Sequence, residues 1–220
     1  MPKPDDRDFE AFVLANTAVL CPPHVPEIRL RLADEAHDLW LKTEDELQAI
    51  GLPPPFWAFA WAGGQAVARF VLDHPERVAG RRVVDFATGS GLVAIAVAKA
   101  GAANVTAIDV DPFCRTAVRL NAALNGVDIT FDDSDPIGNP LDADILLAGD
   151  VFFDAAMAAA VAPWFDRLVR DGRTVLVGDP GRRYLPADRV EELARYEVPV
   201  TRALEDAEVK RTTVWRWRAD

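Results

Sequence analysis

A glycine-containing turn after an apolar segment carries the clearest chemical signal in the sequence. It runs Asp85-Phe-Ala-Thr-Gly89-Ser-Gly91 and leads directly into an apolar helical run. Glycines in such a turn let the backbone approach a ligand closely, and the helix that follows offers free N–H groups. A second acid, Asp109, comes twenty residues after Gly89 and ends the next apolar run, where a carboxylate suits the hydroxyl groups of a ribose. The spacing therefore predicts a site for an adenosine-containing ligand.

Two ligands suit this turn, and they differ in charge. The run Gly89-Ser-Gly91-Leu-Val-Ala94 matches the GxGxxG/A pattern of dinucleotide-binding proteins, which would make the protein an NAD(P)-dependent oxidoreductase. Asp85, however, stands where the strand enters the turn, and a carboxylate there disfavours a pyrophosphate and favours ammonium and sulfonium charges. This acid favours S-adenosylmethionine as the cofactor, with NAD(P) as the alternative. Asp111 precedes Pro112, a pair typical of a helix start, so we interpret Asp111 first as an N-cap.

Strands that alternate with helices must position these side chains. The sequence predicts strands over residues 82–86, 105–109, 129–131, 145–148, 174–177, 197–201 and 213–218. Helices are predicted over residues 65–72, 92–100, 111–125, 154–169 and 186–195. This alternation indicates an α/β fold with a doubly wound, mostly parallel sheet, and the short link between the last two strands makes them an antiparallel hairpin. Because ligands bind at the carboxyl ends of such strands, Asp85, Asp109 and Asp150 should meet at one edge of the sheet.

The first 62 residues follow a different pattern. A helix is predicted to begin near Asp5 and Asp6, prolines then interrupt the chain, and residues 27–32 alternate apolar and charged side chains like a half-exposed strand. Residues 44–50 indicate a short helix. We therefore expect residues 1–62 to form an N-terminal helical and strand extension that packs on a catalytic domain of residues 63–220, within a single structural domain overall.

Composition and charge narrow the possible partners. The chain of 220 residues carries 35 acidic and 24 basic side chains, a net charge of −11, and half of its residues are hydrophobic, enough for a substantial core. This acidity argues against nucleic acid as a partner and favours a cationic ligand or a basic protein surface. Neither Cys21 nor Cys114 belongs to a CxxC pair, and the acids near Asp133 lack EF-hand spacing, so we expect no metal. The sequence has no signal-peptide pattern and no apolar run of bilayer-spanning length, so we expect a cytoplasmic protein without a membrane partner. We also expect it to be a monomer.

The residues of the turn resemble those of a known enzyme family. With Asp109, the turn resembles the class I, seven-stranded methyltransferases, with Ala87 in place of the first glycine of their acid-x-Gly-x-Gly-x-Gly motif. Five further segments, in the right order, resemble the lysine methyltransferases of the electron-transfer flavoprotein β subunit: residues 26–32, 56–66, 149–154, 178–182 and 212–215. The resemblance implies a Rossmann-like, seven-stranded sheet, S-adenosylmethionine as the methyl donor, and a lysine of that β subunit as the acceptor. The acidic N-terminus lacks the presequence of mitochondrial members, which favours a bacterial form.

The resemblance also implies which residues form the site. Those at the cofactor are Trp61, Asp85, Ala87, Thr88, Gly89, Ser90, Gly91, Asp109, Val110, Asp133 and Ser134. The family's Asp-x-x-aromatic motif lies at the substrate lysine and maps to Asp150 and Phe153. A free lysine has a pKa of about 10.4, far above that of a carboxyl group, so we interpret Asp150 as an acceptor that orients the amine and not as the base that deprotonates it. Phe152 or Phe153 would line the channel and offer a ring face to the cation.

Three alternatives stay open on the sequence alone. A methyltransferase could act on another protein, such as a ribosomal protein, or on a small amine. The same turn could serve an NAD(P)-dependent oxidoreductase, which would bind NADH and not S-adenosylhomocysteine. A non-catalytic protein could also keep the cofactor fold and recognise the flavoprotein without modifying it.

Overall fold

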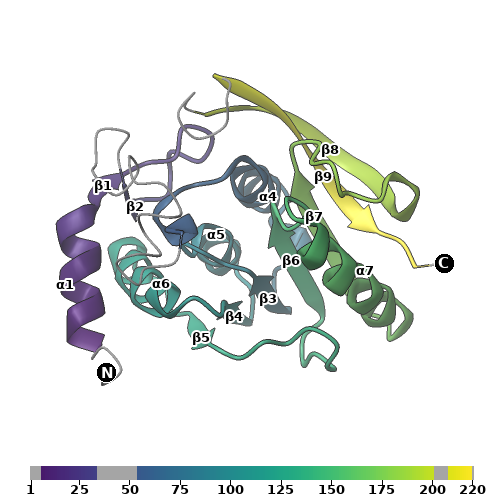
Figure 1. Cartoon of the computed structure of the whole chain (residues 1–220), viewed down its shortest axis with the longest axis horizontal. Coiled ribbons are helices and arrows are strands. Elements are labelled where there is room, and N and C mark those ends of the chain that lie inside the picture. The colour runs from purple at the N-terminus through teal and green to yellow at the C-terminus, as the bar shows by residue number, and fades with distance from the viewer. Residues whose placement is uncertain (1–5, 34–53, 201–207, 220) are drawn as a thin grey trace.

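The computed structural model describes residues 6–33, 54–200 and 208–219 of the chain. At its centre lies a seven-stranded sheet in the order β5-β4-β3-β6-β7-β9-β8 (Figure 1). The strands span Arg82–Phe86 (β3), Asn104–Ile108 (β4), Thr130–Asp132 (β5), Ile145–Gly149 (β6), Thr174–Asp179 (β7), Val190–Pro199 (β8) and Val209–Trp217 (β9). The first five strands in this order are parallel, whereas β9 runs antiparallel to both β7 and β8. The structure thus confirms the mostly parallel, seven-stranded sheet and its C-terminal hairpin.

Helices cover both faces of this sheet (Figure 1). One face carries α4 (Ala62–Asp73), α5 (Leu92–Lys99) and α6 (Pro112–Asn125), and the other carries α7 (Ala155–Arg170). The central strands are apolar on both sides because alternate residues enter different cores. In β3, for example, Val83 packs with the helices of the first face, whereas Val84 packs with α7. No helix within the described ranges is long and apolar enough to cross a membrane.

Sequence signals at helix ends agree with the observed boundaries. The Asp111 carboxylate accepts a hydrogen bond from Phe113 N–H at 2.9 Å, and Pro112 occupies the first helical position of α6. Gly126 closes this helix with a left-handed backbone (φ 64°). Asp154 caps α7 in the same way as Asp111 caps α6. Asp111 lies in the loop after β4 and Asp154 in the loop after β6, so the two caps fix the helix starts that border the predicted site.

The predicted helix over residues 186–195 is wrong. A short 3-10 turn, η3 (Ala187–Arg189), is followed at once by β8, so most of these residues form the edge strand of the sheet. Glu191, Glu192 and Ala194 have good helix propensity, but their backbones pair with β9, with one irregularity between Glu192 and Ala194. Long-range pairing here outweighs local propensity. The two hairpin strands are accordingly longer than the predicted strands 197–201 and 213–218.

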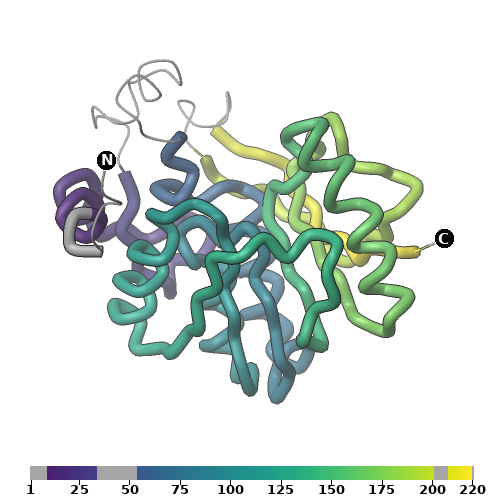
Figure 2. Tube along the Cα trace, turned by 60° about the horizontal axis from the view of Figure 1, so that its bottom comes forward, coloured from purple at the N-terminus to yellow at the C-terminus, as the bar shows by residue number. Residues whose placement is uncertain are grey.

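The N-terminal segment packs against α6. It contains α1 (Asp6–Asn16), the short strands β1 (Ala18–Leu20) and β2 (Leu30–Leu32), and a 3-10 turn, η1 (Phe56–Ala58). Phe9 and Phe12 contact the ring of Phe113 on α6, with centroid distances of 4.8 and 5.1 Å, and Figure 2 shows the N-terminal helix beside α6 at one end of the molecule. The antiparallel partner of β2 is β1, whose three residues are too few to give a strand pattern in the sequence. The helix predicted over residues 44–50 lies outside the described residues.

Two asparagines one turn apart on α6 bond to the backbone of this segment, and one of them, Asn121, also bonds to the glycine turn. Asn121 is fully buried, and its Oδ1 accepts from Arg31 N–H at 2.7 Å while its Nδ2 donates to the Ser90 carbonyl at 2.8 Å. Asn125 exchanges two hydrogen bonds with the backbone of Arg29. Because each amide supplies both a donor and an acceptor, the backbone before residue 33 is hydrogen-bonded to α6 as well as packed on it.

The N-terminus of α4 meets the ends of β6 and β7 at backbone contact distance. A Cβ atom on Gly63 would lie 2.3 Å from the Gly178 carbonyl oxygen, and one on Gly149 would lie 2.7 Å from the nitrogen of Gly64. Backbone atoms cannot give way to such overlaps, so helix and strands meet here only because Gly63, Gly149 and Gly178 lack side chains. Gly64 itself has room, since its Cβ would meet only one methyl group, at 4.0 Å.

This contact predicts opposite effects for two adjacent substitutions in α4. Gly63→Ala should lower the free energy of unfolding by about 1–3 kcal/mol, because the new methyl group overlaps backbone atoms. Gly64→Ala should leave it unchanged or raise it by up to about 1 kcal/mol, because alanine is the better helix residue and the position has room. Urea unfolding followed by circular dichroism measures both. Equal stability of the two variants would contradict the packing described for this helix end.

Candidate active site

A cavity of about 550 Å³ opens at the carboxyl ends of β3, β4 and β6. The strand order reverses between β3 and β6, which is where open α/β sheets bind their ligands. Ten of the residues predicted for the site line the cavity: Trp61, Asp85, Ala87, Thr88, Gly89, Ser90, Asp109, Val110, Asp150 and Phe153. Gly91, Asp133 and Ser134 are not among its lining residues. The volume is in the range of pockets that hold small molecules and cofactors.

Asp85 is the next-to-last residue of β3 and is buried against the first turn of α5. Its Oδ2 accepts hydrogen bonds from the Thr88 hydroxyl and from Ala94 N–H, so a carboxylate already occupies the N-terminal end of this helix. An acid therefore takes the place that a pyrophosphate would need. Burial raises the pKa of Asp85 to about 7, and the charge of Asp109 adds to the rise while the two hydrogen bonds oppose it. Both of these hydrogen bonds go to Oδ2, and among the described residues no hydrogen bond to Oδ1 is found, so this oxygen is available to a ligand.

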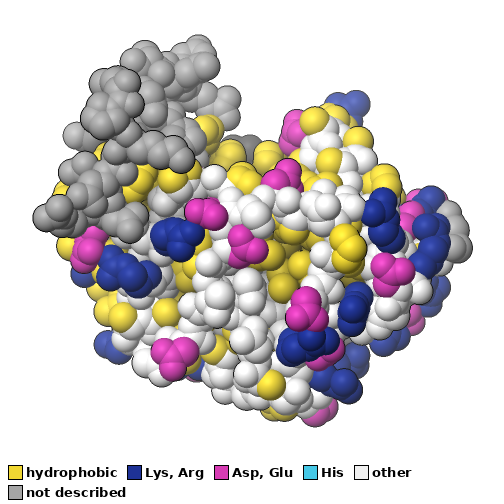
Figure 3. Space-filling model, turned by 90° about the horizontal axis from the view of Figure 1, so that it is seen from below, with side chains coloured by type: hydrophobic (Ala, Val, Ile, Leu, Met, Phe, Trp, Pro, Cys, Tyr) yellow, Lys and Arg dark blue, Asp and Glu magenta, His cyan; other side chains and the backbone are white. Residues whose placement is uncertain are grey.

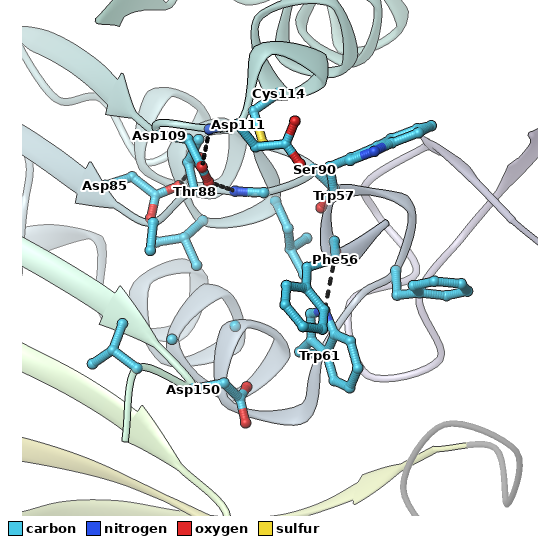
Figure 4. Close-up of a pocket in the computed structure, with 18 of the residues that line it drawn as sticks. Phe56, Trp57, Trp61, Asp85, Thr88, Ser90, Asp109, Asp111, Cys114 and Asp150 are labelled. Atoms are coloured by element: carbon cyan, nitrogen blue, oxygen red, sulfur yellow. Dashed lines mark hydrogen bonds between the residues drawn. The ribbon is translucent and has the colours of Figure 1, made fainter. Parts of the chain in front are cut away.

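Asp109 follows β4 and holds the glycine turn. Its Oδ2 accepts from Gly89 N–H at 2.9 Å, and its Oδ1 accepts from Asp111 N–H at 3.0 Å. Figure 4 shows Asp109 close to Asp85 and Asp111 on one side of the cavity. Burial raises the pKa of Asp111 to about 6, with a further contribution from the charge of Asp109. Asp111 thus caps α6, as predicted, and also lines the cavity beside two other acids.

Ala87 and Gly91 of the glycine turn have a left-handed backbone. Ala87 adopts a left-handed conformation (φ 53°), which is why glycine suits this position of the motif. Gly91 has φ 82° at the N-cap of α5, and a Cβ there would lie 3.1 Å from a methyl group of Val118 on α6. Gly91 therefore shapes the turn from behind, against α6, instead of lining the cavity.

Aromatic side chains form another wall. Trp61 immediately precedes α4, and its indole N–H donates to the Phe56 carbonyl at 3.0 Å. The ring of Phe56 lies 5.8 Å from each of the rings of Trp61 and Phe153, so the three form a continuous row, which we call the aromatic row. Phe153 is 48% exposed, whereas Phe152 is fully buried and stacks on Trp217. Of the two phenylalanines, Phe153 lines the cavity and Phe152 belongs to the core.

Asp150 lies across the cavity from Asp85 and Asp109 (Figure 4). It has a left-handed backbone (φ 57°), and its Oδ2 accepts from Gly63 N–H at 2.5 Å, at the N-terminus of α4. Its Oδ1 accepts from Nη2 and Nε of Arg182, at 2.8 and 3.2 Å. Burial raises the pKa of Asp150, and the positive charge of Arg182 opposes that rise. Partners from two other elements therefore orient this carboxylate.

The structure brings Arg182 and Phe56 into the site, whereas Asp133 and Ser134 are not among the residues that line the cavity. In the sequence, Arg182 and Phe56 are only members of matching segments, and the contact between Arg182 and Asp150 spans 32 residues, which no local pattern reveals. Asp133, by contrast, pairs with Arg115 on α6 at 2.7 Å, and Ser134 is exposed. The contact of Asp133 and Ser134 with an adenine group stays a prediction.

The charges that line the cavity fit a cation better than an anion. Its described lining holds four carboxylates, those of Asp85, Asp109, Asp111 and Asp150, and one guanidinium, that of Arg182. That guanidinium is paired with Asp150, on the side away from the glycine turn. A dinucleotide would place its pyrophosphate beside Asp85, whereas an ammonium and a sulfonium group meet favourable charge there. The geometry therefore disfavours the NAD(P) alternative.

Curated relatives match nearly the whole chain. The electron transfer flavoprotein β-subunit lysine methyltransferase of Xenopus laevis is 38% identical over 212 residues, which cover 93% of this chain and 85% of that protein. Those of Danio rerio and Homo sapiens are 34% and 32% identical, each over 96% of this chain and over 84% and 82% of their own lengths. The chain belongs to this family of lysine methyltransferases.

More distant methyltransferases share the fold of this chain. The model of the ribosomal protein L11 methyltransferase family matches residues 69–171. Among solved structures, magnesium protoporphyrin IX methyltransferase of Synechocystis with bound S-adenosylmethionine aligns with a TM-score of 0.54 at 16% identity, over 85% of this chain and 100% of that one. The ribosomal protein L11 methylase of Lactobacillus delbrueckii aligns with a TM-score of 0.51 at 21% identity, over 74% and 81%. With the family established, this chain is an S-adenosylmethionine-dependent methyltransferase.

The buried acid at the glycine turn predicts a pH-dependent cofactor affinity. Because a cationic ligand stabilises the ionised form of Asp85, the affinity for S-adenosylmethionine should fall as the pH drops from about 7.5 to about 6, and a proton should be released on binding. Calorimetric titrations in two buffers of different ionisation enthalpy measure both effects. Asp85→Asn should bind more weakly and lose most of the proton release, keeping only the part due to Asp111. An affinity that rises toward acid pH would contradict this prediction.

Proposed function

We propose that this protein transfers methyl groups from S-adenosylmethionine to lysine side chains of the electron transfer flavoprotein β subunit. The extent of the likeness supports this most strongly, because relatives named for that activity match 93–96% of the chain, including the cavity segments outside the glycine turn. The cavity also has two sides that suit the reaction. One side gathers acids for a cationic donor, and the other presents an oriented carboxylate beside an aromatic ring.

On this proposal the cofactor lies between the glycine turn and the aromatic row. Asp85 would accept from its ammonium group, Asp109 would accept from the ribose hydroxyls, and Val110, which is 67% exposed, would contact the adenine. Residues 87–91 would form the turn that follows its outline, and Trp61 would close the site from the other side. When bound, this cofactor supplies an electrophilic methyl group on a positively charged sulfur.

The substrate amine is proposed to enter beside Asp150 and Phe153. Methyl transfer needs a neutral nitrogen whose lone pair points at the methyl carbon, and positioning of this kind supplies much of the rate. Asp150 would accept a hydrogen bond from the amine and so fix the direction of its lone pair. Phe153 would border the channel and offer a ring face to the ammonium form before it loses its proton. Desolvation inside the cavity would lower the pKa of the lysine, so no strong base is required.

The ribosomal alternative rests on less of the chain. The match to the L11 methyltransferase family covers residues 69–171, which include the glycine turn and Asp150 but neither Phe56 and Trp61 nor Arg182. These uncovered residues border the part of the cavity at which the amine is proposed to enter. The L11 match therefore supports the cofactor chemistry and says little about the acceptor.

The N-terminal residues have a proposed part in the site. We propose that residues 1–62 form an extension of a catalytic domain of residues 63–220 and help to close the cavity. Six residues of the described part line the cavity: Pro54, Phe56, Trp57, Phe59, Ala60 and Trp61. Asn121 bonds both to the extension and to the glycine turn. We further propose that the protein is a bacterial form that acts as a monomer in the cytoplasm.

Intact-mass measurement tests the proposed acceptor. Purified electron transfer flavoprotein, incubated with this enzyme and S-adenosylmethionine, should gain mass on its β subunit in steps of one methylene unit. Peptide mapping should place the gain on lysine. Ribosomal protein L11 and free lysine serve as competing acceptors in parallel reactions. Methylation of either competitor with an unmodified β subunit would overturn the proposed acceptor, and binding of the β subunit without any mass gain would overturn catalysis.

The role of Asp150 predicts a loss of turnover with retained cofactor binding. Asp150→Asn keeps the shape of the side chain and an acceptor for Gly63 N–H, so it spares the helix end better than alanine would. Its kcat should fall about 100-fold, while its affinity for S-adenosylhomocysteine should stay within about threefold of the wild type. Rates with a labelled methyl group and calorimetry measure the two quantities. The matched control is Asp154→Asn, which changes an exposed helix cap outside the cavity lining and should keep full turnover. Undiminished turnover of Asp150→Asn would contradict the proposed role of Asp150.

A further inference from the structure

We propose that Arg182 is a positioning residue that holds Asp150 ionised and correctly oriented at the amine end of the cavity. The proposal rests on the proposed function, which makes Asp150 the acceptor for the lysine amine. Arg182 is not assigned a contact with the reacting atoms, because its guanidinium is bound to Asp150. It acts on the reaction through that carboxylate.

The three hydrogen bonds to Asp150 fix the plane of its carboxylate. Nη2 and Nε of Arg182 donate to Oδ1 at 2.8 and 3.2 Å, and Gly63 N–H donates to Oδ2 at 2.5 Å. The Asp150 side chain is 9% exposed and that of Arg182 is 23% exposed, so water has little access to the pair. Rotation of the carboxylate would break bonds on both oxygens at once, and this keeps the group in one orientation toward the cavity.

The loop after β7 places the guanidinium. Asp179, the last residue of β7, is 1% exposed, and its Oδ1 accepts from the N–H groups of Gly181 and Arg182 at 2.7 and 2.6 Å. These bonds close a tight turn directly behind Asp150, whose own N–H donates to the Gly178 carbonyl at 2.9 Å. The same strand end therefore holds the backbone of Asp150 and presents the cation that pairs with its side chain. Residues 178–182, one of the segments that resemble the lysine methyltransferases, therefore hold the backbone of Asp150 and supply the cation that pairs with its carboxylate.

The charges around Asp150 explain why a cation is needed there. Asp179 on β7 faces it as a second acid, whereas Arg182 and the N–H of Gly63 at the start of α4 are the favourable partners. Burial raises the pKa of Asp150, Asp179 adds to the rise, and Arg182 and Gly63 oppose it. Without the guanidinium, the carboxyl group would keep its proton to a higher pH.

Protonation of Asp150 would defeat its proposed role. An ionised carboxylate accepts a hydrogen bond from the amine and leaves the nitrogen lone pair free for the methyl carbon. A protonated carboxyl group would instead donate its O–H to that lone pair. Arg182 also neutralises the carboxylate, which therefore stabilises the ammonium form of the lysine less than an unpaired anion would. Both effects extend activity toward lower pH, so loss of Arg182 should move activity to higher pH.

Two substitutions at Arg182 and one beside it test the proposal. Arg182→Gln removes the charge, Arg182→Lys keeps the charge but loses the two-nitrogen contact, and Arg183→Gln changes an exposed neighbour as the matched control. For Arg182→Gln, kcat at about pH 7 should fall about 10- to 100-fold, the acid limb of the kcat profile should move to higher pH, and activity should partly recover near about pH 9. Arg182→Lys should lie between this variant and the wild type, and Arg183→Gln should match the wild type. Unchanged affinity for S-adenosylhomocysteine confirms that each variant is folded.

The ionisation of Asp150 gives a second readout that needs no turnover. In carbon-13 NMR of aspartate-labelled protein, with the Asp150 signal assigned by its loss in Asp150→Asn, this carboxyl group should ionise at a higher pH in Arg182→Gln than in the wild type. A fall in kcat without a shift of either the rate profile or the NMR titration would overturn the proposal. A change confined to KM for the protein substrate would also overturn it, because Arg182 would then be a substrate contact. If the wild type leaves the β subunit unmodified, the proposed function fails, and the NMR titration still decides the pairing of Arg182 with Asp150.

Discussion

The close backbone contact between the start of α4 and the ends of β6 and β7 is the constraint on which the site depends. It requires glycine at positions 63, 149 and 178, and it brings Gly63 N–H to the carboxylate of Asp150. Trp61 immediately precedes α4, so the same contact also places one member of the aromatic row. A single helix end therefore positions the carboxylate proposed to meet the amine and the wall beside it. The opposite wall, at the glycine turn, belongs to a different strand, β3, and a different helix, α5.

The carboxylates on the two sides of the cavity differ in their charged partners. At the glycine turn, burial raises the pKa values of Asp85 and Asp111, so a positively charged ligand stabilises their ionised forms. On the other side, Asp150 already has its cation in Arg182. This asymmetry suits a reaction in which the donor arrives charged and the acceptor nitrogen must be neutral. On the face seen in Figure 3, acidic and basic side chains lie beside one another, so the net charge of −11 is not gathered into a single acidic patch there.

How much of the site the sequence predicts depends on which contacts are local. The glycine turn and Asp109 are predictable because strand, turn and helix follow one another directly. Asp150 is predictable because it directly follows an apolar strand. The roles of Asn121 and Arg182 are not, because each acts on partners at least 31 residues away. The predicted helix over residues 186–195 fails for a related reason, since its helix-forming side chains belong to a backbone that pairs with β9.

A bisubstrate compound tests most directly whether the acids at the glycine turn and Asp150 serve one active site. In such a compound the ε-nitrogen of a lysine peptide is joined covalently to the adenosine and amino-acid parts of the cofactor, so one molecule must reach both sides of the cavity. It should bind at least about tenfold more tightly than S-adenosylhomocysteine. Asp150→Asn should abolish that advantage, and Asp109→Ala should weaken the compound and S-adenosylhomocysteine alike. An affinity no better than that of S-adenosylhomocysteine, or an advantage that survives in Asp150→Asn, would contradict a shared site.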